Sequence, residues 1–449
     1  MTQKYYQQLR LALRYMILQN WWFTTLLGIQ EPLRPPVKGH IKSDVLIVGA
    51  GAAGLAAALC FVGTGKKVIL IDRNICGGSS TGKSAGFLTP DSELELSQLL
   101  RRYGTKGARE LWEVAAKGVD IMVSNIRKHK IECDLQVQDC LFLGNGSSGL
   151  RDVKEEVESR KKLGYSSVMY DKSEVPSVLG SDAYSGAIRY TGTYGVNALL
   201  YAQGVKQVLL QNGIDVFESS EVLSHKDHTV YTHLGSVTAD QIIFCIDKPR
   251  PEVTTYSKDV YHAQTFLSIS EPLSDSDIAN LFPQGPLQCW DSDLIYTYFR
   301  LTGTKRLLVG GGDMLTTYAK NDTTTTRVIN RVIGGLKEKI PSIQNLRFIQ
   351  YWQGRIDMTR DLIPTVLRDP TRPWIHFVLG CVGLPWATFC GNFAAQNVLD
   401  NEEPNAEKYY QYFSPDRKFF MPLWLEQILG KRLVFTVNNA WAKYKQTNS

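Results

Sequence analysis

The chain has 449 residues, 43% of them hydrophobic, which is enough for two or three domain-sized units with buried cores. Its net charge of +6 is modest and lies at the two ends, so a nucleic-acid-binding stripe across the middle is excluded. Eight cysteines without CxxC spacing, and no apparent cleavable signal peptide, predict reduced thiols and a cytoplasmic location.

Residues 1–42 form an aromatic and basic extension. Its apolar segment 5–28 is interrupted, among other residues, by Arg10, Arg14, Gln19 and Asn20, too often for a helix that spans a membrane. We expect this segment to lie on a surface, either that of the protein itself or a membrane interface, which Trp, Tyr and Arg side chains favour. The prolines of residues 31–36 bias their predecessors away from helix and predict an extended linker.

The run DVLIVGAGAAGLAAALCF, which begins at residue 44, predicts a buried strand, a glycine turn and a helix of small residues. Gly49 allows the tight turn, Gly51 lets backbone N–H groups approach a pyrophosphate, and Gly54 lets the helix lie close on the strand. Asp72 ends the next apolar strand, at the distance expected for a ligand of the ribose hydroxyls. These features together predict a dinucleotide site, without distinguishing NAD from FAD.

A second glycine-rich loop, Gly77–Ser84, satisfies the GxxxxGK[ST] pattern of an ATP-hydrolysing P-loop. A P-loop follows its strand directly and opens a long helix, whereas this loop runs on to Pro90, which ends the local pattern. No strand ending in a magnesium-binding acid stands out downstream. We therefore favour a loop that adds N–H and hydroxyl donors to the dinucleotide site, and keep the NTPase as an alternative.

The rest of the chain alternates helical and strand-like patterns. After the second glycine loop, the pattern first predicts core helices and then strands that belong to two different sheets. An antiparallel substrate sheet is expected between residues 260 and 348, followed by a return to the nucleotide-binding sheet. The expected helices are 92–128, 152–163, 197–212 and 393–399, and the expected strands are 214–217, 241–246, 294–301, 306–309 and 374–380.

With these pieces in order, the chain resembles the D-amino-acid-oxidase-like FAD-dependent oxidoreductases, also called the DAO or glycine oxidase family. The resemblance covers about residues 43–400 and looks closest to the gamma-glutamylputrescine oxidoreductase branch, whose members also carry an aromatic N-terminal extension. It rests on VGAGAAG, the Ser/Gly loop 78–86, FESSEV at 217–222, YFR at 298–300, LLVGGG at 307–312 and WQGRIDMTRDLIP at 352–364.

The resemblance implies an α/β fold, with a Rossmann-like FAD-binding domain and an inserted antiparallel β-sheet substrate domain. The basic and apolar C-terminal tail is expected either to pack on the N-terminal segment or to attach the protein to a membrane or partner. The expected boundaries are 1–42 for the extension, 43–130, 192–250 and 351–403 for the FAD-binding domain, 131–191 and 251–350 for the substrate domain, and 404–449 for the tail.

By the same resemblance the cofactor is FAD. It is expected to be noncovalent, because loop 77–86 holds no His and segment 352–364 holds no Cys. The glycine turn would hold the pyrophosphate, Asp72 the adenosine ribose and the backbone of Val222 the adenine, while the turn 380–386 would pass the pyrimidine side of the flavin. No metal is expected. The expected cofactor-binding residues are Gly49, Gly51, Ala52, Ala53, Gly54, Asp72, Arg73, Ser79, Ser80, Thr81, Lys83, Ser84, Ala85, Gly86, Val222, Gly354, Gly380, Val382, Gly383, Leu384 and Pro385.

The predicted substrate site departs from the family pattern. Members that oxidise free amino acids place a carboxylate-binding arginine two residues after the glycine of the Trp-x-Gly motif, where this chain has Ile356. Arg355 is one residue early and would face the other side of a strand. Arg300 is an alternative source of positive charge, and Asp357 is a candidate partner for a substrate ammonium. A simple α-amino acid is therefore less favoured than an amine or N-substituted amino acid.

The resemblance implies hydride transfer from a carbon next to nitrogen to flavin N5, after which water hydrolyses the imine. A neutral amine in a dry pocket with aromatic walls needs no dedicated base. Oxygen or a quinone would reoxidise the flavin. The candidate catalytic residues are His262, Tyr298, Arg300, Arg355 and Asp357, and the candidate aromatic walls are Tyr261, Tyr296, Tyr298 and Trp386.

Two further alternatives stay open. Oxidation of a 2-hydroxy acid on the same fold would need a general base, for which His262 is a better candidate than His376, which lies in an apolar strand. The second alternative is a flavoprotein that docks to a membrane or partner through its basic, aromatic ends, with catalysis secondary or lost. We expect an FAD-dependent enzyme that oxidises a C–N bond, in the cytoplasm or peripheral at the inner face of the membrane.

Overall fold

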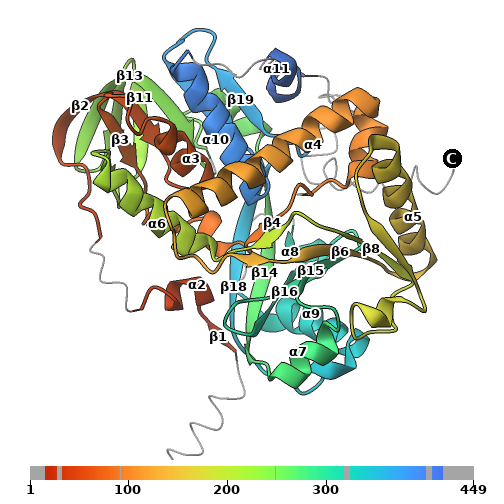
Figure 1. The fold of residues 1–449 in the computed structure, drawn as a ribbon. Coiled ribbons are helices and arrows are strands. Elements are labelled where there is room, and N and C mark those ends of the chain that lie inside the picture. Colours follow the sequence, from red (N-terminus) through yellow and green to blue (C-terminus); the bar gives the residue numbers. More distant parts are fainter. Residues whose placement is uncertain are drawn as a thin grey trace, which may run out of the picture. The chain divides into compact units, whose positions relative to one another are not determined.

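The computed structural model describes residues 16–27, 33–91, 93–247, 249–317, 324–400 and 407–417. The chain divides into two compact units, each drawn from separate stretches of sequence (Figure 1). The first unit comprises Met1–Gly28, Asp134–Val196 and Gln264–Gly354, and the second comprises Ile29–Cys133, Asn197–Ala263 and Arg355–Ser449.

The second unit is built on a sheet that has eight strands in the described part of the chain. Its central strands β10, β3, β2, β13 and β20 are neighbours in that order and pair in parallel. They are rich in buried Val, Ile and Leu, as in a sheet covered on both faces. The strands are β2 (Gly39–Val48), β3 (Val68–Ile71), β10 (Asp215–Phe217), β11 (Val222–Lys226), β12 (Thr229–Thr232), β13 (Gly235–Cys245), β19 (Thr365–Arg368) and β20 (Ile375–Leu379).

Helices pack closely in this unit, and glycines let α10 approach both α3 and α4 (Figure 1). A Cβ atom on Gly391 of α10 would collide with the carbonyl oxygen of Ala53 in α3, and one on Gly118 of α4 would collide with that of Pro385. The helical elements are α3 (Ala52–Cys60), α4 (Leu96–Lys128), α6 (Ala198–Gln211), α10 (Leu384–Val398), α11 (Glu407–Phe413) and the 3-10 turns η1 (Thr81–Lys83) and η3 (Thr255–Asp259); a short strand, β4 (Phe87–Leu88), also belongs here.

The first unit carries the predicted second sheet, with nine strands among the described residues in the order β1-β18-β14-β17-β16-β15-β6-β8-β7. The sheet is mostly antiparallel as expected, but β1 pairs in parallel with β18 and β15 pairs in parallel with β6. The nine strands are β1 (Ile17–Leu18), β6 (Asp139–Gly144), β7 (Val168–Asp171), β8 (Gly186–Tyr190), β14 (Tyr261–Pro272), β15 (Leu287–Asp291), β16 (Tyr298–Leu301), β17 (Arg306–Gly311) and β18 (Phe348–Met358). The short strands β5 (Gln136–Val137) and β9 (Tyr194–Gly195) pair with each other in a separate small sheet.

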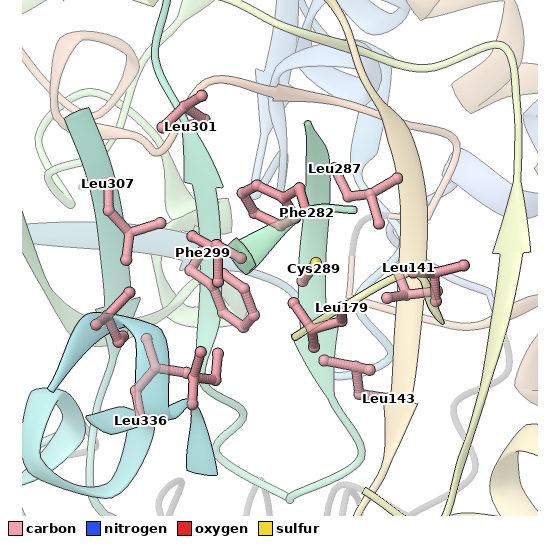
Figure 2. Packing of buried hydrophobic residues seen from close by; sticks show 14 of the residues in the cluster. Leu141, Leu143, Leu179, Phe282, Leu287, Cys289, Phe299, Leu301, Leu307 and Leu336 are labelled. Atoms are coloured by element: carbon pink, nitrogen blue, oxygen red, sulfur yellow. The ribbon is translucent and has the colours of Figure 1, made fainter. Parts of the chain in front are cut away.

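Apolar side chains from one face of this sheet form the core of the first unit. Figure 2 shows Leu307, Phe299, Cys289 and Leu141 on the successive strands β17, β16, β15 and β6. Leu336 and other apolar side chains cover them, so the sheet and its helices share one core. The helical elements of this unit are α2 (Trp21–Thr24), α5 (Gly146–Leu163), α7 (Asp275–Leu281), α8 (Met314–Thr317), α9 (Thr326–Lys339), η2 (Val175–Ser177) and η4 (Pro341–Ile343).

Residues 16–27, which we call the N-terminal arm, lie on the edge of the first unit's sheet. Strand β1 pairs with Gln350 and Tyr351 of β18. Trp22 is 1% exposed and packs edge-on against Trp352, with ring centroids 6.3 Å apart. This part of the predicted surface segment therefore lies on the protein itself. Residues 1–15, and residues 418–449 of the predicted tail, lie outside the described residues.

Within the described ranges, no helix is both long enough and apolar enough to cross a membrane.

Several predicted elements begin at other residues than expected. Helix α10 begins at Leu384 rather than 393, because Gly383 with φ +82° is its N-cap and Pro385 is compatible with the first helical turn. The prediction treated both residues as part of a turn. Strand β2 begins at Gly39, inside the predicted extension, and α5 begins at Gly146, six residues before the predicted charged helix.

Candidate functional site

The carboxyl ends of the parallel strands in the second unit meet at one edge of its sheet. Val48 at the end of β2 is in register with Phe244 of β13, and Cys245 is in register with Val378 of β20. Strands β3 and β13 flank β2 on opposite sides, so the strand order reverses there. In open α/β sheets, ligands bind outside the carboxyl ends at such a point.

The predicted glycine turn lies at this edge and requires its glycines. Gly49 has φ +101°, and a Cβ atom there would collide with the carbonyl oxygen of Cys245. A Cβ atom on Gly54 would collide with the carbonyl oxygen of Gly49. Gly51 is the N-cap of α3, and as a glycine it has no side chain with which to cap that helix. The N-terminus of α3 therefore presents backbone N–H groups and a positive dipole end suited to a pyrophosphate.

Asp72 braces this turn from the end of β3. Its carboxylate accepts hydrogen bonds from the N–H groups of Ala50 and Asn74, both at 2.7 Å. Burial raises the pKa of Asp72, and the two N–H groups oppose that shift. The side chain thus fixes the geometry of the turn, and its predicted contact with a ribose stays a prediction.

The Ser/Gly loop folds back onto the glycine turn. Gly77 donates its N–H to the carbonyl oxygen of Ala50 at 2.8 Å, and the Thr81 hydroxyl accepts from the N–H of Ala52 at 3.0 Å. The loop closes in the three-residue turn η1 and leads to strand β4 rather than to a long helix. It therefore lacks the helix of a P-loop and lies beside the glycine turn. Its other predicted cofactor residues are Ser79, Ser80, Lys83, Ser84, Ala85 and Gly86.

A second helix N-terminus lies at the same edge of the sheet. The turn after β20 is held by Gly380, φ +65°, and Gly383, φ +82°. Helix α10 follows at once, again with no side-chain cap. A Cβ atom on Gly380 would lie 2.8 Å from Cγ2 of Thr359, so this turn packs tightly on the segment after β18. Two helix N-termini and glycine-lined turns fit the anionic and electron-accepting parts of FAD.

His262 and Asp357, both predicted as candidates, form a hydrogen-bonded pair. His262 Nδ1 lies 2.6 Å from Asp357 Oδ1, and the side chains are 36% and 1% exposed. With Nδ1–H donating to the carboxylate, Nε2 is left as a proton acceptor. The next residue, Met358, has its carbonyl carbon 3.2 Å from a Cβ atom placed on Gly380. Asp357 therefore directly precedes the residues, Met358 and Thr359, that pack on the turn at Gly380.

The structure does not bring all candidate catalytic residues into one unit. Tyr298 and Arg300 belong to the first unit, where the Tyr298 hydroxyl lies 2.9 Å from that of Thr265. Arg300 is fully buried and donates to the carbonyl oxygen of Val196 at 2.7 Å. Burial lowers the pKa of Arg300 to about 10. Gly354 ends the first unit, and Arg355, half-buried on β18, begins the second.

His376 is part of the sheet core. It lies in β20, 3% exposed, with Nε2 3.2 Å from Oε1 of Gln241. Burial, and to a lesser extent the charge of Arg368, lower the pKa of His376 to about 4. An imidazole buried in the sheet core with so low a pKa is a weak base, which does not favour the general-base role considered for His376.

The sequence did not identify the arginine contacts around the turn after β18. Arg360 donates to the Tyr261 hydroxyl at 3.1 Å, and Arg417 forms two 2.8 Å hydrogen bonds with Asp361. Arg417 and Asp361 are 56 positions apart, and no local pattern connects residues at such a separation. The acidic and basic residues were visible in the sequence, but their pairing was not.

Comparison with known proteins identifies the family. The model of the family "DAO: FAD dependent oxidoreductase" matches residues 44–396. The chain is 26% identical to the probable oxidoreductase OrdL of Haemophilus influenzae, over 82% of this chain and 86% of that protein. It is also 26% identical to the gamma-glutamylputrescine oxidoreductase of Escherichia coli, over 82% of this chain and 85% of the relative.

A solved structure shares the fold. The glycine oxidase of Geobacillus kaustophilus superposes with a TM-score of 0.72 at 17% identity, and the match covers 84% of this chain and all of that one. The predicted α/β fold, with a Rossmann-like domain and a second sheet, is therefore confirmed.

Proposed function

The chain belongs to the DAO family of FAD-dependent oxidoreductases, and we propose that it oxidises a C–N bond of an amine or amino acid with His262 as proton acceptor. FAD is the cofactor of the family, and when bound it takes up the hydride from the substrate carbon. The names of the relatives support this class of bond, since they refer to gamma-glutamylputrescine and glycine.

We propose that the second unit holds the cofactor in the predicted way. The N-terminus of α3 and the glycine turn before it would bind the pyrophosphate. The turn from Gly380 to Pro385, with the N-terminus of α10, would supply N–H donors to the ring. Asp72 and Val222 would lie at the adenosine end. The collisions that a Cβ atom would cause at Gly49 and Gly54 support a turn shaped for close backbone approach.

The role of His262 follows from the state in which amines bind. An alkylamine is an ammonium ion at neutral pH, and its nitrogen lone pair must be free before the neighbouring C–H bond can lose a hydride. We propose that His262 Nε2 takes the proton from the substrate ammonium while the Asp357 carboxylate stabilises the resulting imidazolium. The single observation that carries this assignment is the 2.6 Å pair beside the segment packed on Gly380.

We further propose an amine or N-substituted amino acid as substrate. By the resemblance noted above, family members that oxidise amino acids have a carboxylate-binding arginine at the position that Ile356 occupies in this chain. Arg300 is buried on main-chain carbonyls of the first unit, which does not favour it as a replacement. Oxygen or a quinone is proposed as the electron acceptor, and peripheral membrane contact through the ends of the chain is a separate proposal.

The proposal is tested by anaerobic bleaching of the yellow holoenzyme with amines, N-substituted amino acids, α-amino acids and 2-hydroxy acids. We expect bleaching by an amine or N-substituted amino acid, and a loss of about 100-fold or more in its rate in His262→Asn. His233→Asn is the matched control, because His233 is an exposed histidine of the same unit. Bleaching by hydroxy acids alone would overturn C–N oxidation, and an unchanged rate in His262→Asn would overturn the proton-acceptor role.

A further inference from the structure

We infer that Arg417 is a positioning residue for the His262–Asp357 pair, acting through the turn that follows Asp357. Arg417 lies beyond residues 44–396, the part of the chain that the family shares. The catalytic meaning of this inference rests on the proposed function, whereas the contacts that carry it do not.

Arg417 neutralises a buried carboxylate. Its Nε and Nη2 atoms each lie 2.8 Å from one oxygen of Asp361, and the two side chains are 5% and 11% exposed. Burial would raise the pKa of Asp361, but the hydrogen bonds and charge of Arg417 outweigh burial and lower that pKa. Arg417 also donates to the carbonyl oxygen of Ile363 at 2.6 Å and to the Thr365 hydroxyl at 3.1 Å. It thus binds the turn at several points.

The turn needs this support because its backbone is strained. Leu362 has φ +68°, a left-handed conformation that a leucine rarely adopts. Asp361 Oδ1 accepts from the Ile363 N–H at 3.2 Å and from the Thr359 hydroxyl at 2.9 Å. The same carboxylate oxygen that binds Arg417 therefore holds the strained residue from both sides. Without Arg417, a buried charge would lose its partner and the turn would lose its tie to the C-terminal segment.

The turn is coupled to both members of the catalytic pair. Asp357 lies two residues before Thr359, at the end of β18. Arg360, in the turn, donates to the hydroxyl of Tyr261 at 3.1 Å, and Tyr261 precedes His262 on β14. Any relaxation of the turn therefore acts on Asp357 through the main chain and on His262 through its neighbour.

The other contacts at Asp361 do not duplicate Arg417. Arg102 donates to the main-chain oxygen of Asp361 at 3.3 Å, and the Tyr103 hydroxyl lies 3.5 Å from Oδ2. Among the described residues, the Asp361 carboxylate forms its ion pair with Arg417.

The test measures the chemical reactivity of His262 in the holoenzyme without any substrate. Diethyl pyrocarbonate modifies accessible imidazoles, and mass spectrometry of the His262 peptide gives its rate constant. In Arg417→Met we expect a rise of threefold or more, because the ring is no longer held against Asp357. Arg417→Lys should restore part of the difference. Arg372→Met is the matched control, since Arg372 pairs with Asp369 in the same unit but is 37% exposed.

A smaller rise than threefold, or a fall, in Arg417→Met would overturn the inference even if the variant were less stable. If that variant does not fold, Arg417→Met combined with Asp361→Asn removes both charges together, and the same threshold applies to it. The anaerobic bleaching rate should fall at least tenfold in the variant that folds. Failure of the proposed function is distinguishable, because no amine would then bleach the wild type while His262 reactivity still responded to Arg417.

Discussion

The N-terminal arm and the C-terminal segment 407–417 both lie outside the part of the chain that the family shares, but they attach to the protein by different forces. The arm adds β1 to the edge of a sheet and buries Trp22 against Trp352. The C-terminal segment packs Tyr409 on Phe389, with ring centroids 5.3 Å apart, and then forms the buried ion pair of Arg417.

The difference between these attachments is one of charge. Main-chain hydrogen bonds and apolar burial depend little on pH, so attachment of the arm should be nearly constant between pH 4 and 8. The lowered pKa of Asp361 means that its contribution to stability is present above the unfolded value of about 4 and is lost as the pH falls through the folded value. The two ends should therefore respond differently to acid.

The largest expected effect is that of Trp22→Ala. Removing a fully buried tryptophan should lower the free energy of unfolding by about 3–5 kcal/mol, with the same loss at pH 5 and pH 8. Urea denaturation measures the loss. Phe23→Ala is the control on the same short helix, because Phe23 is 36% exposed and should lose about 1 kcal/mol or less. A pH-dependent loss in Trp22→Ala would break the comparison.

The second prediction concerns His376, a second group that makes the protein less stable in acid. Removing its contribution allows the contribution of Asp361 in the C-terminal contact to be measured separately. Burial lowers the pKa of His376 to about 4, so between pH 6.5 and 4 the unfolded state binds more protons than the folded one. Stability therefore falls as the pH drops through this window, by up to about 3 kcal/mol. Glutamine at this position cannot take up a proton, so in His376→Gln the free energy of unfolding should fall much less over the same pH range.

Denaturation of His376→Gln and the wild type at pH 7, 5.5 and 4.5 measures this effect. Below pH 4 the remaining loss should come from carboxylates such as Asp361. An unchanged slope between pH 7 and 4.5 in His376→Gln would show that histidine burial is not its cause.

The comparison also shows what the sequence could reveal. The glycine turn at Gly49, its helix and Asp72 were predicted in place, because short-range chemistry within one run of residues determines them. His262 and Asp357 were each predicted as candidates, but their pairing depends on how β14 lies beside β18, which the residues between them do not encode locally. Arg417 was not singled out at all, because its partner is 56 positions away.

Helix α10 shows that the same residue types can indicate either a turn or the start of a helix. The glycine and proline at residues 383 and 385 indicated a turn that continued to residue 386. In the structure the same two residues begin the helix, because a proline in the first turn needs no intrahelical N–H bond. The flavin-side position predicted for this segment is thus compatible with a helix N-terminus rather than with a loop.

The smallest expected effect concerns Trp21, the neighbour of Trp22 in the arm. The guanidinium carbon of Arg306 lies 4.4 Å from the centre of the Trp21 ring. Trp21→Leu keeps an apolar side chain but removes this cation–π contact, so it should cost about 0.5–1 kcal/mol in urea denaturation. Losses of equal size in Trp21→Leu and Trp22→Ala would mean that the arm is held along its whole length. A several-fold smaller loss in Trp21→Leu would instead identify Trp22 as its anchor, the apolar counterpart of the charged Arg417.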